Sequence, residues 1–142
     1  MTAITVYDGA QGIGGNKILV EENGSGKVES LCSRASELGL SVICVPEIVS
    51  ALNRRLREKG LTHAQYMEAK EHLLDDVRDA DIIQLTPPVL ACAVRILEAN
   101  SVRAMDALHI ACALEWKAEL FASADARQLA AAKRAGLKTQ RT

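Results

Sequence analysis

The chain has 142 residues, of which 49% are hydrophobic and 25% charged, and this balance excludes a disordered or low-complexity chain and favours one soluble globular domain. A net charge of −1 excludes a global basic field, so any contact with nucleic acid must come from a local patch. Only 3% of the residues are aromatic, which argues against recognition of nucleic acid by base stacking on several rings.

Targeting and redox features indicate a cytoplasmic protein. No apolar stretch approaches the roughly 18 residues of a membrane span, and residues 1–7 lack the basic and apolar regions of a signal peptide. The cysteines are scattered through apolar segments and match no zinc or CxxC spacing, so we expect reduced, buried thiols. They are Cys32, Cys44, Cys92 and Cys112.

The first half of the chain alternates expected strands with expected helices. An apolar run at 4–7 predicts a strand, and apolar residues at helical spacing over 28–38 predict a helix that Gly39 would end. Residues 41–45 are β-branched and unalternated, which is typical of a strand buried on both faces. Pro46 suits the first turn of a helix that continues to Leu56.

The alternation continues to the C-terminus. Thr62 and Gln65 have the spacing of a capping box, which predicts a helix to about Val77. The further strands are expected at 81–85, at 120–122 and from 137 onward, and the further helices at 88–98, 105–116 and 126–135. We therefore predict an α/β three-layer sandwich around a mainly parallel sheet, with residues 1–142 in a single domain.

Four carboxylates lie in or beside segments that otherwise resemble core. Glu47 is the only charged residue between 42 and 52, and Asp106 and His109 are the only polar residues between 104 and 114. An ionised carboxylate in such a buried helix is costly unless it is paired or bound to a metal. Asp8 and Asp125 each follow an expected strand.

These acids are expected to meet at one cleft. Ligands of open α/β sheets bind beyond the carboxyl ends of the strands, where Asp8, Glu47 and Asp125 would converge with Asp106. Clustered carboxylates repel one another unless a hard divalent cation, Mg²⁺ or Mn²⁺, lies among them. Such ions would activate water and stabilise the charge of an in-line attack on a phosphodiester.

Each acid also has a purely structural explanation. Asp125 can be a helix N-cap, and Asp8 can belong to a turn. Glu47 can be a first-turn acid favoured by the helix dipole. Asp106 can pair with Arg103, which lies one turn earlier.

At these residues the sequence resembles the PIN-domain family, and most closely its toxin ribonucleases from toxin–antitoxin pairs. Residues 105–113 are similar to the family's Asp-Ala-Leu-His helix, residues 123–125 to its Thr-x-Asp segment, and residues 46–52 to the helix that carries its glutamate. The resemblance extends from about residue 27 to the C-terminus.

The resemblance implies a fold and an activity. The fold is a parallel sheet of strand order 3-2-1-4-5, and the activity is Mg²⁺- or Mn²⁺-dependent cleavage of single-stranded RNA. It also implies a homodimer and inhibition by a small cognate antitoxin. Asp8, Glu47, Asp106 and Asp125 would be the catalytic, metal-binding residues, and Ser123 would support the site by hydrogen bonding.

Residues 1–26 depart from the family pattern. Asp8 is followed by Gly9 and Ala10, where the family has small hydroxyl residues, and residues 7–19 resemble the opening strands of metallo-β-lactamase-fold hydrolases. No His-x-His-x-Asp zinc motif follows them. The altered start motivates a second hypothesis, a PIN-like module that has lost catalysis and binds RNA or protein, and a third is metal-dependent cleavage of DNA.

A basic cluster follows the glutamate in the same expected helix. It comprises Arg54, Arg55, Arg57 and Lys59. The three arginines are candidates for contacts with RNA phosphates beside the metal site, and the alternative is a solvated helix face. His109, three residues after Asp106, is expected to be a packed, hydrogen-bonded histidine rather than a metal ligand.

Overall fold

The computed structural model describes residues 2–5 and 35–142, and these residues alternate between strands and helices as predicted. In chain order the elements are β1 (Thr2–Thr5), β2 (Glu37–Ser41), α2 (Cys44–Arg57), α3 (His63–Arg78), β3 (Asp81–Ile83), α4 (Pro87–Ala99), α5 (Ala104–Glu115), β4 (Leu120–Ser123), α6 (Ala126–Arg134) and β5 (Thr139–Arg141). The expected first strand shares two residues with β1. Most of the helix expected at 28–38 lies outside the described residues.

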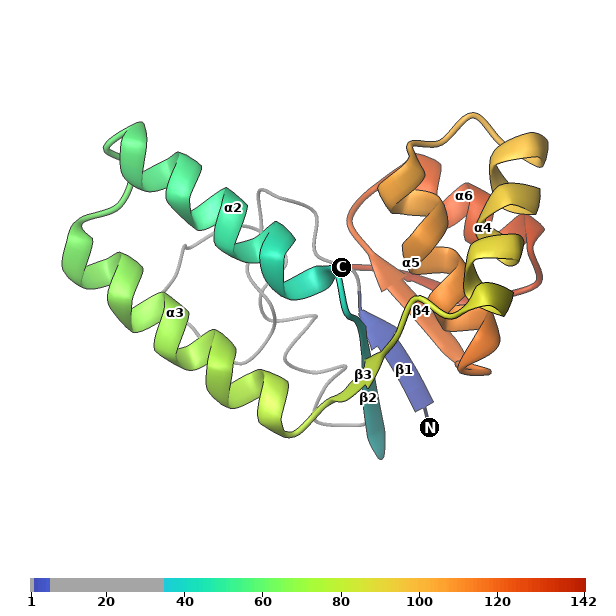
Figure 1. Ribbon diagram of the computed structural model, residues 1–142, viewed down its shortest axis with the longest axis horizontal. Helices are drawn as coiled ribbons and strands as arrows, with labels where there is room; N and C mark the ends of the chain where they lie inside the picture. Colours follow the sequence, from blue (N-terminus) through green and yellow to red (C-terminus); the bar gives the residue numbers. More distant parts are fainter. Residues whose placement is uncertain (1, 6–34) are drawn as a thin grey trace.

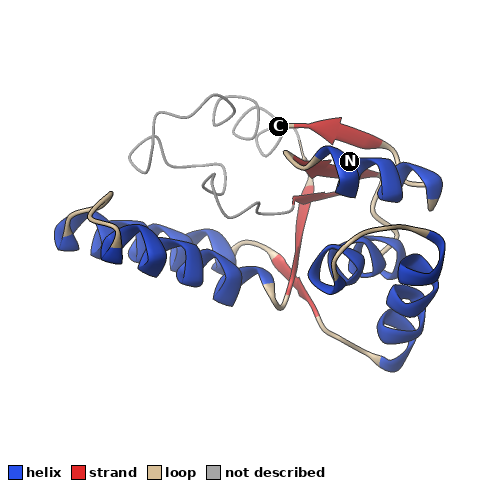
Figure 2. Cartoon of the chain, turned by 90° about the horizontal axis from the view of Figure 1, so that it is seen from above, coloured by secondary structure: helices blue, strands red, loops and turns tan. Residues whose placement is uncertain are grey.

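The strands form one parallel sheet between two layers of helices. Its order is β3-β2-β1-β4-β5, the same order that the family resemblance implies. Helices α2 and α3 lie on one side of the sheet, and α4, α5 and α6 lie on the other (Figures 1 and 2). The predicted three-layer α/β sandwich is therefore confirmed, and the carboxyl ends of all strands point the same way.

Each face of the sheet has its own apolar cluster. Leu40 of β2 packs with α2 and α3, and Phe121 of β4 packs with α4, α5 and α6; both side chains are fully buried. Helix α5 is buried on most sides because alanine and cysteine occupy many of its positions. Small side chains thus fill the core that a sequence poor in aromatic residues must build.

The strand predicted at 41–45 is wrong. Strand β2 ends at Ser41, and the β-branched residues after it enter a turn and the start of α2. Gly39, predicted to end a helix, lies inside β2, where an added Cβ would be only 2.8 Å from the ring of Trp116. This close packing, together with pairing of β2 to β1 and β3, overrides the local strand preference of the residues that follow.

The predicted helix caps agree with the structure. Thr62 and Gln65 form the reciprocal capping box, with the Gln65 N–H donating to Thr62 Oγ1 at 3.1 Å and the Thr62 N–H donating to Gln65 Oε1 at 2.8 Å. Thr86 is the N-cap of α4. Together with α2, α3 forms a helical hairpin that projects from the sheet (Figure 1).

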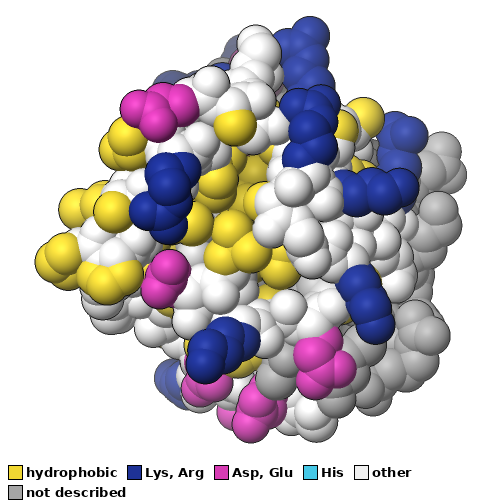
Figure 3. Space-filling model, turned by 90° about the vertical axis from the view of Figure 1, so that its right-hand side faces the viewer, with side chains coloured by type: hydrophobic (Ala, Val, Ile, Leu, Met, Phe, Trp, Pro, Cys, Tyr) yellow, Lys and Arg dark blue, Asp and Glu magenta, His cyan; other side chains and the backbone are white. Residues whose placement is uncertain are grey.

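Helix α4 carries an exposed apolar face. Leu90, Val94 and Leu97 follow one another at spacings of four and three residues, so they lie on one side of the helix, and each is exposed. Apolar side chains are prominent on this side of the molecule (Figure 3). None of the helices in the described ranges is long and apolar enough to span a membrane.

We expect Gly39→Ala to destabilise the fold. The new methyl group would meet Trp116 at 2.8 Å and Ile83 at 2.9 Å, and overpacking of this kind costs about 1–3 kcal/mol. Urea denaturation measures the change in the free energy of unfolding. Gly60→Ala is the matched control because its methyl group meets nothing closer than 3.5 Å; an equal loss in both variants would contradict the packing explanation.

Candidate functional site

Asp106 lies in the first turn of α5 and is held by Arg103. Its Oδ2 accepts hydrogen bonds from the Arg103 N–H at 3.2 Å and from Nε at 3.0 Å, and its Oδ1 accepts one from Nη2 at 3.3 Å. The Asp106 side chain is 12% exposed, whereas that of Arg103 is 76% exposed. The ion pair considered as the structural alternative for Asp106 is therefore present.

Asp125 is the N-cap of α6, as its structural alternative predicted. Its Oδ1 accepts hydrogen bonds from the Arg127 N–H at 2.7 Å and from the Gln128 N–H at 3.3 Å. Its Oδ2 lies 4.0 Å from Arg103 Nη2. One carboxylate oxygen thus caps the helix, and the other faces the guanidinium that also binds Asp106.

The two aspartates line one pocket of about 510 Å³. Its other lining residues are Ser101, Val102, Arg103 and Arg127. The pocket lies at the N-termini of α5 and α6, just beyond the carboxyl end of β4. Helix N-termini carry partial positive charge and bind anions such as phosphate, so this position suits both the carboxylates and a phosphodiester.

Ser123 and Gln128 hold the two aspartates of the pocket in place through hydrogen bonds. The Ser123 hydroxyl donates to Gln128 Oε1 at 2.6 Å and accepts from the Asp125 N–H at 3.0 Å, and Gln128 Nε2 donates to Asp106 Oδ1 at 3.4 Å. Both side chains are almost completely buried. Gln128 was not predicted from sequence, although its position three residues after an N-cap aspartate is a recognisable signal.

Glu47 reaches the same helix from the other layer. Its Oε2 lies 2.5 Å from Nε2 of His109, whose side chain is 3% exposed. His109 follows Asp106 by three residues, so the two side chains share one face of α5. His109 is therefore the packed, hydrogen-bonded histidine that was expected, and it ties Glu47 to the helix that carries Asp106.

The structure thus brings Asp106 and Asp125 together and places Glu47 beside the same helix. In residues 2–5 and 35–142, no three His, Cys, Asp or Glu side chains are close enough to hold a metal ion, and Asp8 lies outside the described residues. The carboxylate oxygens of Asp106 and Asp125 are hard ligands of the kind that Mg²⁺ and Mn²⁺ prefer, and they already flank a cationic group, Arg103.

The sequence profile of the PIN domain family matches residues 16–134. The chain belongs to the PIN domain family. Members of this family are generally nucleases. No match is found among curated proteins.

Solved structures share the fold of this PIN domain. VapBC2 from Rickettsia felis, bound to a promoter DNA fragment, has 11% identity and a TM-score of 0.67, with 100% of this chain and 99% of that chain covered. FitAcB from Neisseria gonorrhoeae has 17% identity, a TM-score of 0.65 and coverages of 98% and 96%. A toxin–antitoxin complex from Klebsiella pneumoniae has 14% identity, a TM-score of 0.61 and 90% coverage of both chains.

The arginine cluster lies at the other end of α2 from Glu47. Arg54, Arg55 and Arg57 are in the last turns of the helix, so a rise of 1.5 Å per residue separates them from Glu47 by roughly 10–15 Å along the axis. Among the described residues of this PIN domain, the arginines that line the pocket of Asp106 and Asp125 are instead Arg103 and Arg127. Contact of the α2 arginines with RNA stays a prediction.

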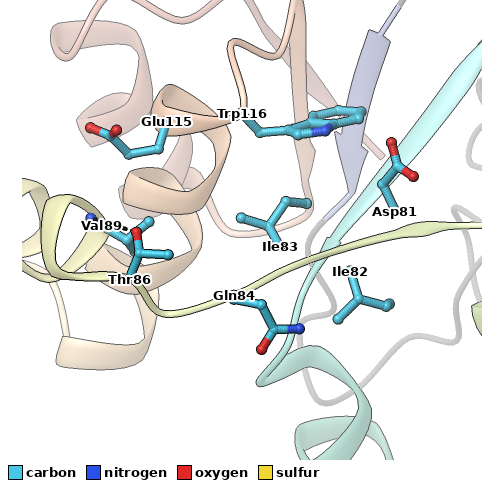
Figure 4. A pocket seen from close by; sticks show the side chains of 8 residues that line it. All are labelled: Asp81, Ile82, Ile83, Gln84, Thr86, Val89, Glu115 and Trp116. Atoms are coloured by element: carbon cyan, nitrogen blue, oxygen red, sulfur yellow. Dashed lines mark hydrogen bonds between the residues drawn. The ribbon is translucent and has the colours of Figure 1, made fainter.

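A second pocket and the buried cysteines lie away from the pocket of Asp106 and Asp125. A pocket of about 440 Å³ lies beside β3 and the end of α5, with the Trp116 ring and Ile83 between Glu115 and Asp81 (Figure 4). It is at the opposite end of α5 from Asp106. The described cysteines, Cys44, Cys92 and Cys112, are buried. Burial raises the pKa of the Cys112 thiol, which keeps it neutral.

We expect the contributions of Ser123 and Gln128 to the free energy of unfolding to be coupled, because their side chains form a hydrogen bond with each other. Ser123→Ala or Gln128→Leu alone leaves the other buried side chain without this hydrogen bond, at a cost of about 1–3 kcal/mol. The double variant removes both partners, so its loss should be smaller than the sum of the two single losses. Urea denaturation of the four proteins measures this coupling, and strictly additive losses would show that the hydrogen bond does not matter.

Proposed function

We propose that the protein is a metal-dependent endoribonuclease of the toxin type, which cleaves single-stranded RNA in the cytoplasm. Mg²⁺ or Mn²⁺ would be held by Asp8, Glu47, Asp106 and Asp125. The observation that carries this proposal is the convergence of Asp106 and Asp125 on one pocket at two helix N-termini. Membership of a family that generally consists of nucleases supports it.

The residues of the chain have separable roles in this proposal. Gln128 and the start of α5 orient the Asp106 carboxylate, and the N-cap bonds orient Asp125. His109 restrains Glu47 through a single carboxylate oxygen. The chemistry that a divalent ion supplies when bound is stabilisation of charge on the phosphate and activation of the attacking water.

We expect Asp106→Asn to lower RNA cleavage by roughly a hundredfold or more, because the change replaces a charged carboxylate ligand of the proposed metal ion by a neutral amide while keeping the shape of the side chain. The assay follows a labelled single-stranded RNA with Mg²⁺ or Mn²⁺, and EDTA should abolish cleavage. Asp79→Asn, at an exposed position after α3, is the matched control and should retain activity. Full activity of Asp106→Asn, or no metal-dependent cleavage by pure protein, would refute the proposal.

A second candidate function is binding without catalysis. It is favoured by the Arg103 guanidinium, which lies against both aspartates, and by the absence of a three-ligand metal cluster in the part of the chain that the structure describes. Fluorescence anisotropy with the same RNA separates the two: saturable binding with no cleavage at any metal concentration supports the binding module. Single-stranded DNA of the same sequence tests the third hypothesis.

The partners proposed are a small cognate antitoxin and a second copy of the chain. The Klebsiella pneumoniae protein of similar fold is a toxin–antitoxin complex, which supports an antitoxin partner. The exposed row of Leu90, Val94 and Leu97 supports a protein interface on α4, because contiguous exposed apolar side chains are typical of such surfaces.

We expect Val94→Glu to split the homodimer, because a buried, unpaired carboxylate at an apolar interface is costly. Sedimentation velocity at several protein concentrations measures the change. Leu74→Glu is the matched control, since Leu74 is an exposed leucine on α3, in the layer on the other side of the sheet. A wild-type protein that stays monomeric, or a dimer split by Leu74→Glu alone, would contradict this interface.

A further inference from the structure

One cationic side chain, Arg103, pairs with both aspartates of the pocket. The Arg103 guanidinium donates through Nε and Nη2 to both oxygens of Asp106, at 3.0 and 3.3 Å, and its Nη2 lies 4.0 Å from Asp125 Oδ2. It therefore binds both carboxylate oxygens of Asp106 and lies near one oxygen of Asp125, and the three side chains line the same pocket. A cation that binds both aspartates must share this position with the guanidinium or replace it.

The contacts of Arg103 are of a kind that can be replaced. Its side chain is 76% exposed, so water and salt screen its ion pairs, and exposed ion pairs are weak. A divalent ion carries twice the charge in a much smaller volume and can bind both carboxylates directly. The balance between the two cations therefore depends on the concentration of the divalent ion.

Departure of the guanidinium would not release Asp106. The carboxylate also accepts hydrogen bonds from the backbone N–H of Arg103, at 3.2 Å, and from the buried Gln128 amide, at 3.4 Å. Neither of these bonds involves the arginine side chain. Helix α5 can therefore keep its first turn, and Asp106 its orientation, while the guanidinium moves into solvent.

We propose that Arg103 is the resident counterion of Asp106 and Asp125 in the metal-free protein, and that a divalent cation binds by displacing its guanidinium. This inference rests on the proposed metal-dependent function. It assigns Arg103 two effects of opposite sign: the side chain stabilises the metal-free fold by neutralising two neighbouring acids, and it weakens metal binding by competing for their oxygens.

Arg127 provides a matched control within the same pocket. It lines the pocket, carries the same charge and is exposed. In the described part of the chain, the ion pairs of Asp106 and Asp125 are with Arg103 and not with Arg127. Replacement of either arginine by glutamine changes the net charge equally. A difference in Mn²⁺ affinity or melting temperature between the two variants therefore reports the direct contact of Arg103 with the aspartates, not the overall electrostatic potential.

The first measurement is Mn²⁺ binding by isothermal titration calorimetry, with full-length protein stripped of metal and at constant ionic strength. We expect Arg103→Gln to bind Mn²⁺ roughly tenfold more tightly than wild type, because the charge-assisted hydrogen bonds to Asp106 and the ion pair with Asp125 no longer have to be broken. Arg127→Gln should change the affinity by less than about threefold, as expected for a screened charge without direct contact.

The second measurement is thermal unfolding in EDTA and in saturating Mn²⁺. In EDTA, Arg103→Gln should melt below both wild type and Arg127→Gln, because two neighbouring carboxylates lose their counterion. Saturating Mn²⁺ should remove this difference, since the metal then neutralises the acids in every variant. Circular dichroism at low temperature confirms that the exposed substitution leaves the fold intact.

The outcomes separate the two levels of the proposal. Tighter Mn²⁺ binding together with a lower melting temperature in EDTA supports the counterion role. If wild type binds Mn²⁺ and Arg103→Gln binds it no more tightly than Arg127→Gln does, the counterion role is overturned. The metal site itself is retained in that case. If neither wild type nor Arg103→Gln takes up Mn²⁺ at millimolar concentration, the metal site itself is overturned, and displacement with it.

Discussion

A buried helix has to satisfy its polar side chains, and α5 carries two of them, Asp106 and His109, on one face. Their partners come from three places in the fold: Arg103 from the helix start, Gln128 from α6 and Glu47 from α2. A buried carboxylate without such partners would cost more than any of these contacts contributes. Because the polar side chains of α5 need hydrogen-bond partners, polar side chains from both helical layers lie together at one end of the sheet.

The same arrangement joins stability to function. The acids that line the pocket also bind backbone N–H groups at helix starts: Asp106 accepts from the N-cap residue of α5, and Asp125 is itself the N-cap of α6. A carboxylate has two oxygens, and in Asp125 one caps the helix while the other faces Arg103. For Asp125, helix capping is thus compatible with the proposed metal-binding role, because the two roles would use different oxygens.

Much of the fold followed from local patterns. The capping box of Thr62 and Gln65 and the N-cap of Thr86 placed the starts of α3 and α4, since caps depend on residues close in sequence. Strand β2 was misplaced because its position depends on Gly39, which admits the ring of Trp116 from a residue 77 positions later in the chain. The secondary-structure propensities of neighbouring residues contain no information about such a long-range contact. The same holds for the role of Gln128, whose partners are Ser123 and Asp106.

The sequence by itself determined the alternation of strands and helices and the family to which the chain belongs, and it singled out four acids as candidates, because these depend on periodicity, residue type and short motifs. Only the tertiary structure decided which acids meet. It placed Asp106 and Asp125 in one pocket, tied Glu47 to His109 and put Arg103, rather than the arginines of α2, between the acids. The physical reason is that Asp106 and Asp125, like Glu47 and His109, belong to different helices, so the distances between them depend on how the layers pack on the sheet. The Arg103–Asp106 pair lies within one helical turn and is therefore visible in the sequence.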